Sequence, residues 1–376
     1  MNNYKESPFQ YLRRKKVEGQ IETEFTPETI DNWYKARAYV LDKLKDVAYT
    51  PGSSEHLHAV ILGDTPLMLS VARQVALSAH FINYNEDNED ESQRNRTVIT
   101  IVSQDETIEQ TLIKEEYLGN LPKYCKTVIY GVEKNKDSYI DIELHVVKEW
   151  NAGVEKCCKE INEKEVETFC GSNSSNTIDT RKAVLASRAY DLGALISNVP
   201  YEDIHDASRY TQALDAFQYD QLEKPWHRLV DEKIQGDLTR VKEALSNVFC
   251  SDCFETRDRE IRKCYGNDLK NYKKYWEKYN DALSKSEHAR WVVEKLIMGY
   301  RPLTLQERIK DERFFISKEK KQFRKQLKKN QTDPAHIDIC SYSDLRRIDP
   351  DSLKYDSFLM LAIPDILKKV NGNAKR

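Results

Sequence analysis

The feature that most constrains the fold is a short stretch of sequence in which nearly every residue is apolar. Residues 58–63 (HAVILG) end on a glycine, and Pro66 then precedes a helical pattern over residues 67–79. A proline in the first turn suits a helix start, because its missing N–H would be unpaired there in any case. A second apolar segment covers residues 97–102 (TVITIV). Strands that are buried on both faces and alternate with helices predict a mostly parallel α/β sheet.

The rest of the chain divides by its local patterns. Further strands are expected at residues 126–132 and 139–147, and helices at residues 27–49 and 180–197. After residue 200 the pattern is helical almost throughout, apart from a short extended piece at residues 337–342. We therefore expect an N-terminal arm and helix (residues 1–50), an α/β domain (residues 51–200) and a mainly helical domain (residues 201–376). The cationic run at residues 318–329 (KEKKQFRKQLKK) is typical of a solvated helix face.

Composition excludes several classes of protein. The 59 Lys and Arg residues are balanced by 62 Asp and Glu residues, which argues against a protein that coats duplex nucleic acid. The chain has no run of the roughly 18–20 apolar residues that a membrane span needs. The first 16 residues are polar and basic, unlike a secretory signal, and the eight cysteines are scattered, so we expect reduced thiols and a cytoplasmic location. Cys250 and Cys253 have no second close pair, so no metal site is expected.

The turn after the first strand is a candidate cofactor site. A dinucleotide-binding fold brings glycines close to a pyrophosphate at a helix N-terminus. Here Gly63 is the single glycine kept, Thr65 offers a hydroxyl, and Asp105 is the candidate acidic residue after the second strand. Asp64 places a negative charge where the phosphate would lie. Two interpretations remain: NAD(P) binding through Gly63, Thr65 and Asp105, or a purely structural Rossmann-like scaffold.

A second candidate is the helix at residues 283–300, which carries Trp291. At 100° per residue, one line along this helix is apolar and predicts the buried face. Its members are Ala289, Val293, Leu296 and Tyr300. The opposite line is centred on Trp291 and mostly charged. Its other members are Glu287, His288, Glu294, Lys295 and Met298. Trp291 either packs beneath another helix or forms a stacking platform for a planar ligand, with Arg290 or Lys295 beside it to meet a phosphate.

No catalytic assignment follows from the sequence. The sequence contains no GxSxG, HExxH or GxxxxGK[ST] motif. Glu287 and His288 carry acid and base groups, but neighbours in sequence point about 100° apart on a helix. The alternative that we favour is that Glu287 and Arg290 or His288 fix this helix against neighbouring segments.

Several of these segments resemble the ryanodine-receptor repeat (RyR) domain. The core segment is Glu287-His288-Ala289-Arg290-Trp291, followed by Gly299-Tyr300, and it resembles that family's EHxRW…G[WY] pattern. Residues 336–345, Tyr355-Asp356 and residues 362–367 (AIPDIL) resemble the closing part of the family pattern. Residues 204–241, which include Trp226, resemble the region before that core in bacterial members. Those members join a TrkA-N-type Rossmann domain to an RyR domain, and the resemblance covers roughly residues 55–370.

The resemblance implies a regulatory, ligand-sensing protein rather than a catalyst. In animal channels, paired repeats hold an adenine nucleotide between aromatic side chains, and bacterial relatives accompany ion channels or defence systems. We therefore expect a nucleotide-like ligand, whose identity is unknown, and a protein partner or a second copy of the chain. The ligand-binding residues that we expect are Trp291, Arg290, Lys295, Glu287, His288, Trp226 and Tyr300. The alternatives are an NAD(P)- or nucleotide-dependent enzyme and a ligand-free structural subunit of a channel or phage-defence assembly.

Overall fold

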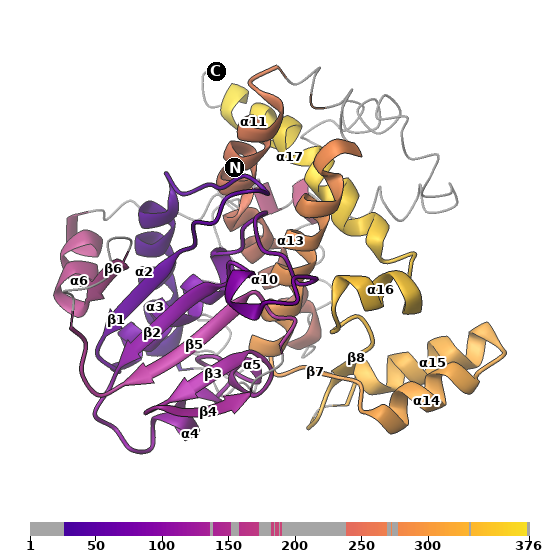
Figure 1. The fold of residues 1–376 in the computed structure, drawn as a ribbon, viewed down its shortest axis with the longest axis horizontal. Helices are drawn as coiled ribbons and strands as arrows, with labels where there is room; N and C mark the ends of the chain where they lie inside the picture. The colour runs from indigo at the N-terminus through magenta and orange to yellow at the C-terminus, as the bar shows by residue number, and fades with distance from the viewer. Residues whose placement is uncertain are drawn as a thin grey trace, which may run out of the picture.

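The structure is a computed structural model, and most of the chain is described in it (Figure 1). The described residues are 26–135, 138–151, 158–172, 182–183, 185–187, 189, 238–268, 272, 277–330 and 332–373. The expected helix at residues 180–197 and the expected boundary near residue 200 lie largely outside these ranges. Trp226 and the whole segment 204–237 also lie outside them. None of the described helices is both long and apolar enough to cross a bilayer.

The N-terminal part contains a six-stranded, mainly parallel sheet, as the sequence predicts. Its strands are β1 (His58–Leu62), β2 (Thr97–Val102), β3 (Lys126–Ile129), β4 (Val132–Asn135), β5 (Ile142–Val147) and β6 (Cys158–Asn162). The strand order is β4-β3-β5-β2-β1-β6, and only the β3–β4 pair is antiparallel. Strand β2 lies beside β1 on one side, and β6 lies beside β1 on the other side. The carboxyl ends of β1 and β6 therefore form a topological switch point, the usual place of a ligand crevice in such sheets.

Two expected strands are shorter in the structure than in the prediction. The segment 126–132 contains β3 and then a reversal at Tyr130 and Gly131, whose φ angles are 51° and 79°. Two residues with positive φ form the tight turn that suits a hairpin, so the chain returns as β4. The segment 139–147 becomes strand only from Ile142 onward.

Two N-terminal helices cover one side of the sheet. Helix α3 (Pro66–Ser78) follows β1, with Thr65 as its N-cap and proline in its first turn. It packs on β1 and β2, and α2 (Pro27–Leu44) packs on α3. Helix α2 ends at Leu44, before the predicted end at residue 49. Short elements η1 (Glu91–Gln93), α4 (Ile108–Leu112) and α5 (Leu121–Tyr124), together with α6 (Glu163–Ser172), complete this part.

The described C-terminal part is mainly helical. Its long elements are α10 (Leu238–Asp252), α11 (Phe254–Tyr265), α13 (Glu277–Ile297) and α17 (Leu353–Asn373). Shorter ones are α14 (Leu305–Arg313), α15 (Ser317–Lys328) and α16 (Tyr342–Ile348), with a two-stranded pairing of β7 (Arg301–Pro302) and β8 (Ala335–His336). The extended piece expected at residues 337–342 is wrong, because β8 ends at His336 and Tyr342 already begins α16.

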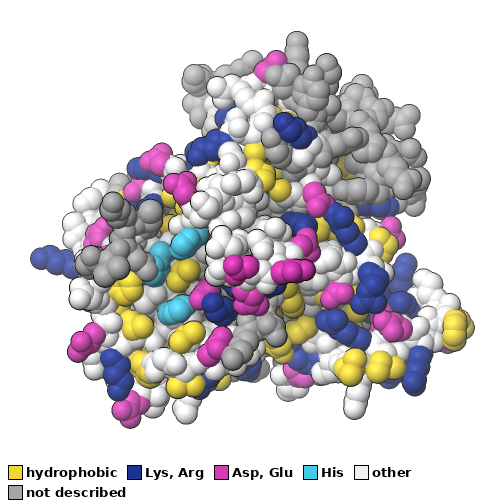
Figure 2. Space-filling view, in the orientation of Figure 1, with side chains coloured by type: hydrophobic (Ala, Val, Ile, Leu, Met, Phe, Trp, Pro, Cys, Tyr) yellow, Lys and Arg dark blue, Asp and Glu magenta, His cyan; other side chains and the backbone are white. Residues whose placement is uncertain are grey.

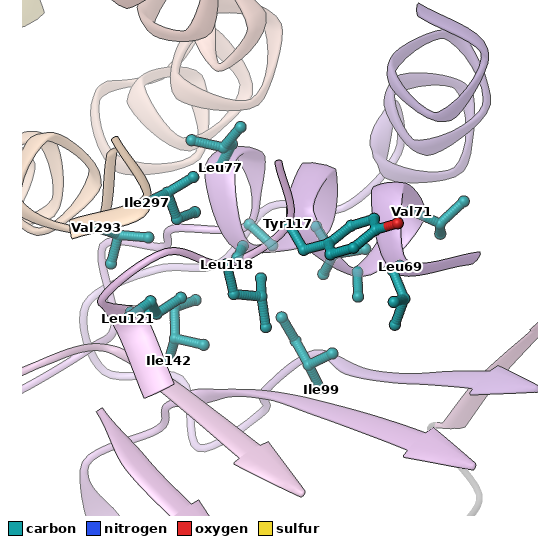
Figure 3. Packing of buried hydrophobic residues seen from close by; sticks show 14 of the residues in the cluster. Leu69, Val71, Leu77, Ile99, Tyr117, Leu118, Leu121, Ile142, Val293 and Ile297 are labelled. Carbon is teal, nitrogen blue, oxygen red and sulfur yellow. The ribbon is translucent and has the colours of Figure 1, made fainter. Parts of the chain in front are cut away.

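One apolar core joins the two parts. Val293 and Ile297 of α13 point toward Leu118 and Leu121, and this group lies above Ile142 of the sheet (Figure 3). Figure 1 shows α13 running through the middle of the molecule, between the sheet and α17. Helix α13 therefore belongs to the core of the α/β part as well as to the helical part.

Candidate functional site

The glycine turn lies where the sequence predicts it. Gly63 directly follows β1, its φ is +119°, and its N–H donates to the Val102 carbonyl at 3.1 Å. A residue with a side chain rarely adopts this φ, so the glycine is needed for the turn into α3. The expectation that this turn lies at the carboxyl end of the first strand, against the next helix, is confirmed.

Carboxylates surround this turn at the switch point. Asp64 accepts a hydrogen bond from the Ser103 hydroxyl, and Thr65 donates its own hydroxyl to Glu163 at 2.9 Å. Asp105 lies in the loop after β2 and accepts from the N–H and the hydroxyl of Thr107. The residues expected to hold a cofactor, Gly63, Thr65 and Asp105, thus lie at one sheet edge but with acidic neighbours. These charges oppose a pyrophosphate, so weak NAD(P) binding here stays a prediction.

The faces of α13 differ from the helical-wheel prediction. The apolar line is predicted to be buried, and this is confirmed for Val293 and Leu296. The opposite, mostly charged line is not left to solvent, because Glu287, His288 and Glu294 are also buried. A helical wheel shows which residues share a face, but it cannot show which faces other elements cover. Other helices pack around most of α13, and they include α3, α10, α16 and α17.

Three of the buried charges form a compact network. Arg290 is fully buried, and its Nη2 lies 2.8 Å from Glu287 Oε1 while its Nη1 lies 2.6 Å from Glu294 Oε2. Burial by itself would lower the pKa of Arg290, but the charges of Glu287 and Glu294 raise it well above its usual value. Arg290 and Glu287 are thus bonded to each other away from solvent. Their expected role as ligand contacts does not fit this arrangement, because a buried charge needs its partner.

Trp291 is half-buried and packs against two histidines. Its ring is stacked on His288 at 6.1 Å between centroids and meets the edge of His336 at 4.8 Å. Lys295 lies 5.5 Å from its centroid, and the Lys295 ammonium donates to Glu294. Burial, together with the charges of nearby lysines, lowers the pKa of His336 well below its ordinary value, so this ring is neutral. The structure therefore favours the packing interpretation of Trp291.

His288 is held by two acceptors. Its Nε2 lies 3.0 Å from the Cys340 carbonyl, and its Nδ1 lies 3.6 Å from Asp356 Oδ2. Burial opposes the charged imidazolium, but the bonds to Asp356 and to Cys340 outweigh it and raise the pKa of His288 to about 10. Tyr300 lies beyond the end of α13, where its carbonyl accepts from Asn120. Apart from Trp226, which lies outside the described residues, the residues expected to bind a ligand thus contact mainly other parts of the chain.

A cavity that the sequence analysis missed lies between the two parts of the chain. It measures about 260 Å³ and is bounded by α2, the end of α3 and the junction of α10 and α11. We call it the seam cavity. Its cationic lining residues are Arg37, Lys45, Lys182 and Arg259, and its acidic ones are Asp252 and Glu255. The remaining lining residues are Leu41, Leu44, Ser78, Ser251 and Thr256.

Two of the four cations have acidic partners in the cavity lining itself. Arg37 Nε donates to Asp252 Oδ2 at 2.9 Å, and Lys182 pairs with Glu255. Asp252 is buried, and burial raises its pKa even though Arg37 opposes the shift. Lys45 pairs with Asp42, a residue outside the lining, and is 61 % exposed. The lining therefore carries more positive than negative charge.

Arg259 differs from the other three cations. Its Nη2 donates to the Leu44 carbonyl at 3.1 Å and to the Thr256 hydroxyl at 3.0 Å, neither of which is charged. Its Nε is buried and has no hydrogen-bond partner in the structure. Burial lowers its pKa, although several carboxylates at longer range oppose the shift. Because an unpaired buried donor costs free energy, Arg259 would gain from an acceptor, and an anion is the strongest one.

A second cavity, of about 370 Å³, adjoins the seam cavity. Arg259 and Glu255 line both cavities. Pro364 and Leu367 of α17 supply apolar surface to the second cavity, together with the polar side chains Arg262, Lys368 and Asn371. Asp258 also lines it, and its Oδ1 is a buried acceptor without a hydrogen-bond partner. We call this the α17 cavity.

No sequence motif marks these cavities. The walls of the seam cavity include α2 and α11, which are more than two hundred residues apart, and the walls of the α17 cavity come from α11 and α17. Periodicity detects only local faces. A weak signal was present in α11, where Arg259 and Arg262 follow each other at helical spacing. Of the sequence-predicted site residues that the structure describes, which excludes Trp226, none lines either cavity. In the described part of the chain, no three His, Cys, Asp or Glu side chains are grouped so as to hold a metal ion, and the described cysteines are free thiols.

Comparison of this chain with protein-family models, with curated proteins and with solved structures gave no match.

Proposed function

We propose that this chain is a regulatory protein that senses a nucleotide-like small molecule and passes the bound state to a partner protein or to a second copy of itself. The observation that carries the proposal is Arg259. It is an arginine whose side chain lines two adjoining cavities, and among the described residues it bonds no carboxylate and its buried Nε has no partner. The resemblance of the sequence to RyR-domain proteins joined to a Rossmann-like domain supports the same function.

The two cavities together match the chemistry of a nucleotide. Phosphate oxygens would accept from Arg259, Lys182 and Lys45 in the seam cavity, where the cations are in excess. The base and sugar would lie in the α17 cavity on Pro364 and Leu367, an apolar surface suited to a planar ring. The unpartnered Asp258 Oδ1 would accept from an exocyclic amine or a hydroxyl group.

The position of the seam cavity supports a sensor role. Its walls include α2 and α3 of the sheet-containing part and α10 and α11 of the helical part. A ligand that contacts both parts stabilises the arrangement in which they are packed together. Binding therefore raises the fraction of molecules that have this arrangement. The proposal needs no chemical step on the ligand.

A thermal-shift screen followed by calorimetry tests the proposal. The probes are ATP, ADP, AMP, NAD(H), NADP(H) and cyclic nucleotides, with pyrophosphate as the simple-anion comparison. A ligand at a hundred times its dissociation constant stabilises the fold by about 2.7 kcal/mol, so a specific ligand raises the melting temperature measurably. Arg259→Gln and Lys182→Gln should each weaken binding by roughly ten-fold or more, the amount that a charged hydrogen bond contributes.

Lys43→Gln is the matched control. Lys43 lies on α2 near Lys45 but pairs with Glu165 and lines neither cavity, so its replacement should leave affinity unchanged. The proposal fails if no probe raises the melting temperature, or if the affinity of the bound probe is the same in the wild type, Arg259→Gln and Lys182→Gln. Release of a cleaved or oxidised product, followed by chromatography, would instead support the enzyme alternative.

A further inference from the structure

A helical hairpin stands out from one end of the molecule. It consists of α14 and α15, which run back to back beyond β7 and β8 (Figure 1). Arg324 fixes it to the body, because its Nε and Nη2 bond Asp311 of α14 while its Nη1 bonds Asp349 at 2.9 Å. Within the hairpin, the rings of Phe314 and Phe323 pack 5.4 Å apart.

The connection between the two helices exposes large apolar side chains. Phe315 is 99 % exposed and Ile316 is 56 % exposed, so the tip of the hairpin is apolar. Leu305 and Ile309 lie one helical turn apart along α14 and are exposed as well. Single exposed apolar residues need no explanation, but this group lies together on one protruding element.

The hairpin is also strongly basic. Residues 305–329 contain ten Lys or Arg and four Asp or Glu, an excess of six positive charges in a chain whose net charge is −3. Along α15, Lys318, Lys321, Lys325 and Lys329 fall within about 80° of one another on the helix wheel, and all four are exposed. None of the four forms an ion pair with any described residue. Figure 2 shows Lys and Arg side chains beside hydrophobic ones over the region of α14 and α15.

We propose that the hairpin of α14 and α15 docks on an anionic lipid bilayer, with Phe315 and Ile316 inserted at the headgroup level. The lysine face then lies over the lipid phosphates. Charge complementarity favours a negatively charged surface, because each basic side chain near an anionic leaflet contributes about 1 kcal/mol. The shape favours a bilayer over an acidic peptide. An acidic peptide could cover Phe315 only if the hairpin offered a groove beside it. Phe315 is instead almost fully exposed at the tip of the hairpin, where it can insert between lipid headgroups.

Vesicle co-sedimentation of the full chain tests this. The vesicles are phosphatidylcholine alone, or phosphatidylcholine with 30 mol % phosphatidylglycerol, at low and at physiological salt. The wild type should sediment with the anionic vesicles and not with the neutral ones, and less at high salt. The triple change Lys318→Gln, Lys321→Gln, Lys325→Gln should lower the partition coefficient by roughly a hundred-fold, since each lysine contributes about five-fold. Phe315→Ser with Ile316→Ser should lower it at least ten-fold.

Lys35→Gln, Lys114→Gln, Lys164→Gln is the matched control, because it removes three exposed lysines that lie elsewhere on the molecule. It should bind the anionic vesicles as the wild type does. All the changed side chains are exposed, and circular dichroism melting curves check that each variant folds. The proposal is overturned if the wild type stays in the supernatant with anionic vesicles, or if the control loses binding as much as the hairpin triple. Binding that needs the lysines but not Phe315 and Ile316, and that a polyglutamate peptide displaces, would identify an acidic protein segment as the occupant instead.

Discussion

Arg290 and Arg259 differ in what surrounds their guanidinium groups. Arg290 donates to Glu287 and Glu294 and is fully buried, so its charge is balanced within the fold. Arg259 donates to a carbonyl and a hydroxyl, lines two cavities and keeps an unpaired Nε. The paired charges of Arg290 hold parts of the core together. Arg259 lines a cavity and has no charged partner among the described residues, so its guanidinium is suited to bind an anion.

At Trp291 the structure leads to a prediction about stability. The ring packs on His288 and His336, and it lines neither the seam cavity nor the α17 cavity. Trp291→Ala should therefore lower the free energy of unfolding by about 3 kcal/mol, the lower end of the cost of deleting a buried tryptophan, because this ring is only half-buried. Denaturant unfolding measures this change. A titration should show unchanged nucleotide affinity in the folded fraction, and a hundred-fold loss of affinity without loss of stability would restore Trp291 as a stacking platform.

His288 predicts how stability depends on pH. Its pKa of about 10 in the folded chain is higher than the ordinary value near 6.5, so the folded state binds this proton more tightly than the unfolded state. That stabilisation is complete below pH ~6.5 and is lost as the pH rises toward 10, by up to about 1.4 kcal/mol per pH unit. Burial raises the pKa of the neighbouring Asp356 from its ordinary value of 3.8 to about 6, so the stabilisation from its proton is lost as the pH rises toward 6, below the range in which His288 acts.

Urea unfolding of the wild type and of His288→Gln between pH 6.5 and 9.5 measures the effect. The wild type should lose stability steadily across this range, and the variant should show a shallower slope. Equal slopes in the two proteins would mean that His288 is not charged in the folded chain.

At the scale of single elements, the C-terminal end of α13 makes a close backbone contact with the sheet-containing part. Asn120 caps its end, because its N–H donates to the Leu296 carbonyl at 2.9 Å and its amide donates to the Gly299 carbonyl at 2.8 Å. Gly119 makes this approach possible. A Cβ added there would lie 2.3 Å from the Ile297 carbonyl oxygen, which is closer than real Cβ contacts allow.

Gly119→Ala should therefore destabilise the protein by about 3 kcal/mol or more, because the backbone of α13 must move away from residue 119. Gly131→Ala is the matched control, since Gly131 also has a positive φ but has nothing within 4 Å of an added Cβ. It should cost only about 1 kcal/mol of backbone strain. Thermal melts compare the two, and equal losses would show that the close approach is unimportant.

Across the whole molecule, the sheet shares its apolar core with α10 and α13, whereas α11 and α17 belong to a second apolar cluster. Leu296 of α13 is buried in the same cluster as Ile99 and Leu144 of the sheet. Leu296→Ala should lower the free energy of unfolding by about 2–5 kcal/mol and should also lower hydrogen-exchange protection in β2 and β5. Leu305→Ala, at an exposed site of α14, should change stability by less than about 0.5 kcal/mol. Unchanged protection in the sheet after Leu296→Ala would indicate two independently stable parts.

Local chemistry alone determined the first two strands of the sheet and the turn between β1 and α3. The apolar runs at residues 58–62 and 97–102 became β1 and β2, and Gly63 with Pro66 set the turn into α3, because burial pattern and backbone preference act over a few residues. The sequence could not show that Glu287, Arg290 and Glu294 are buried, since charges leave water only when tertiary partners balance them. It could not show the seam cavity either. Arg37 of α2 and Arg259 of α11 both line it, and only the tertiary structure brings such distant segments together.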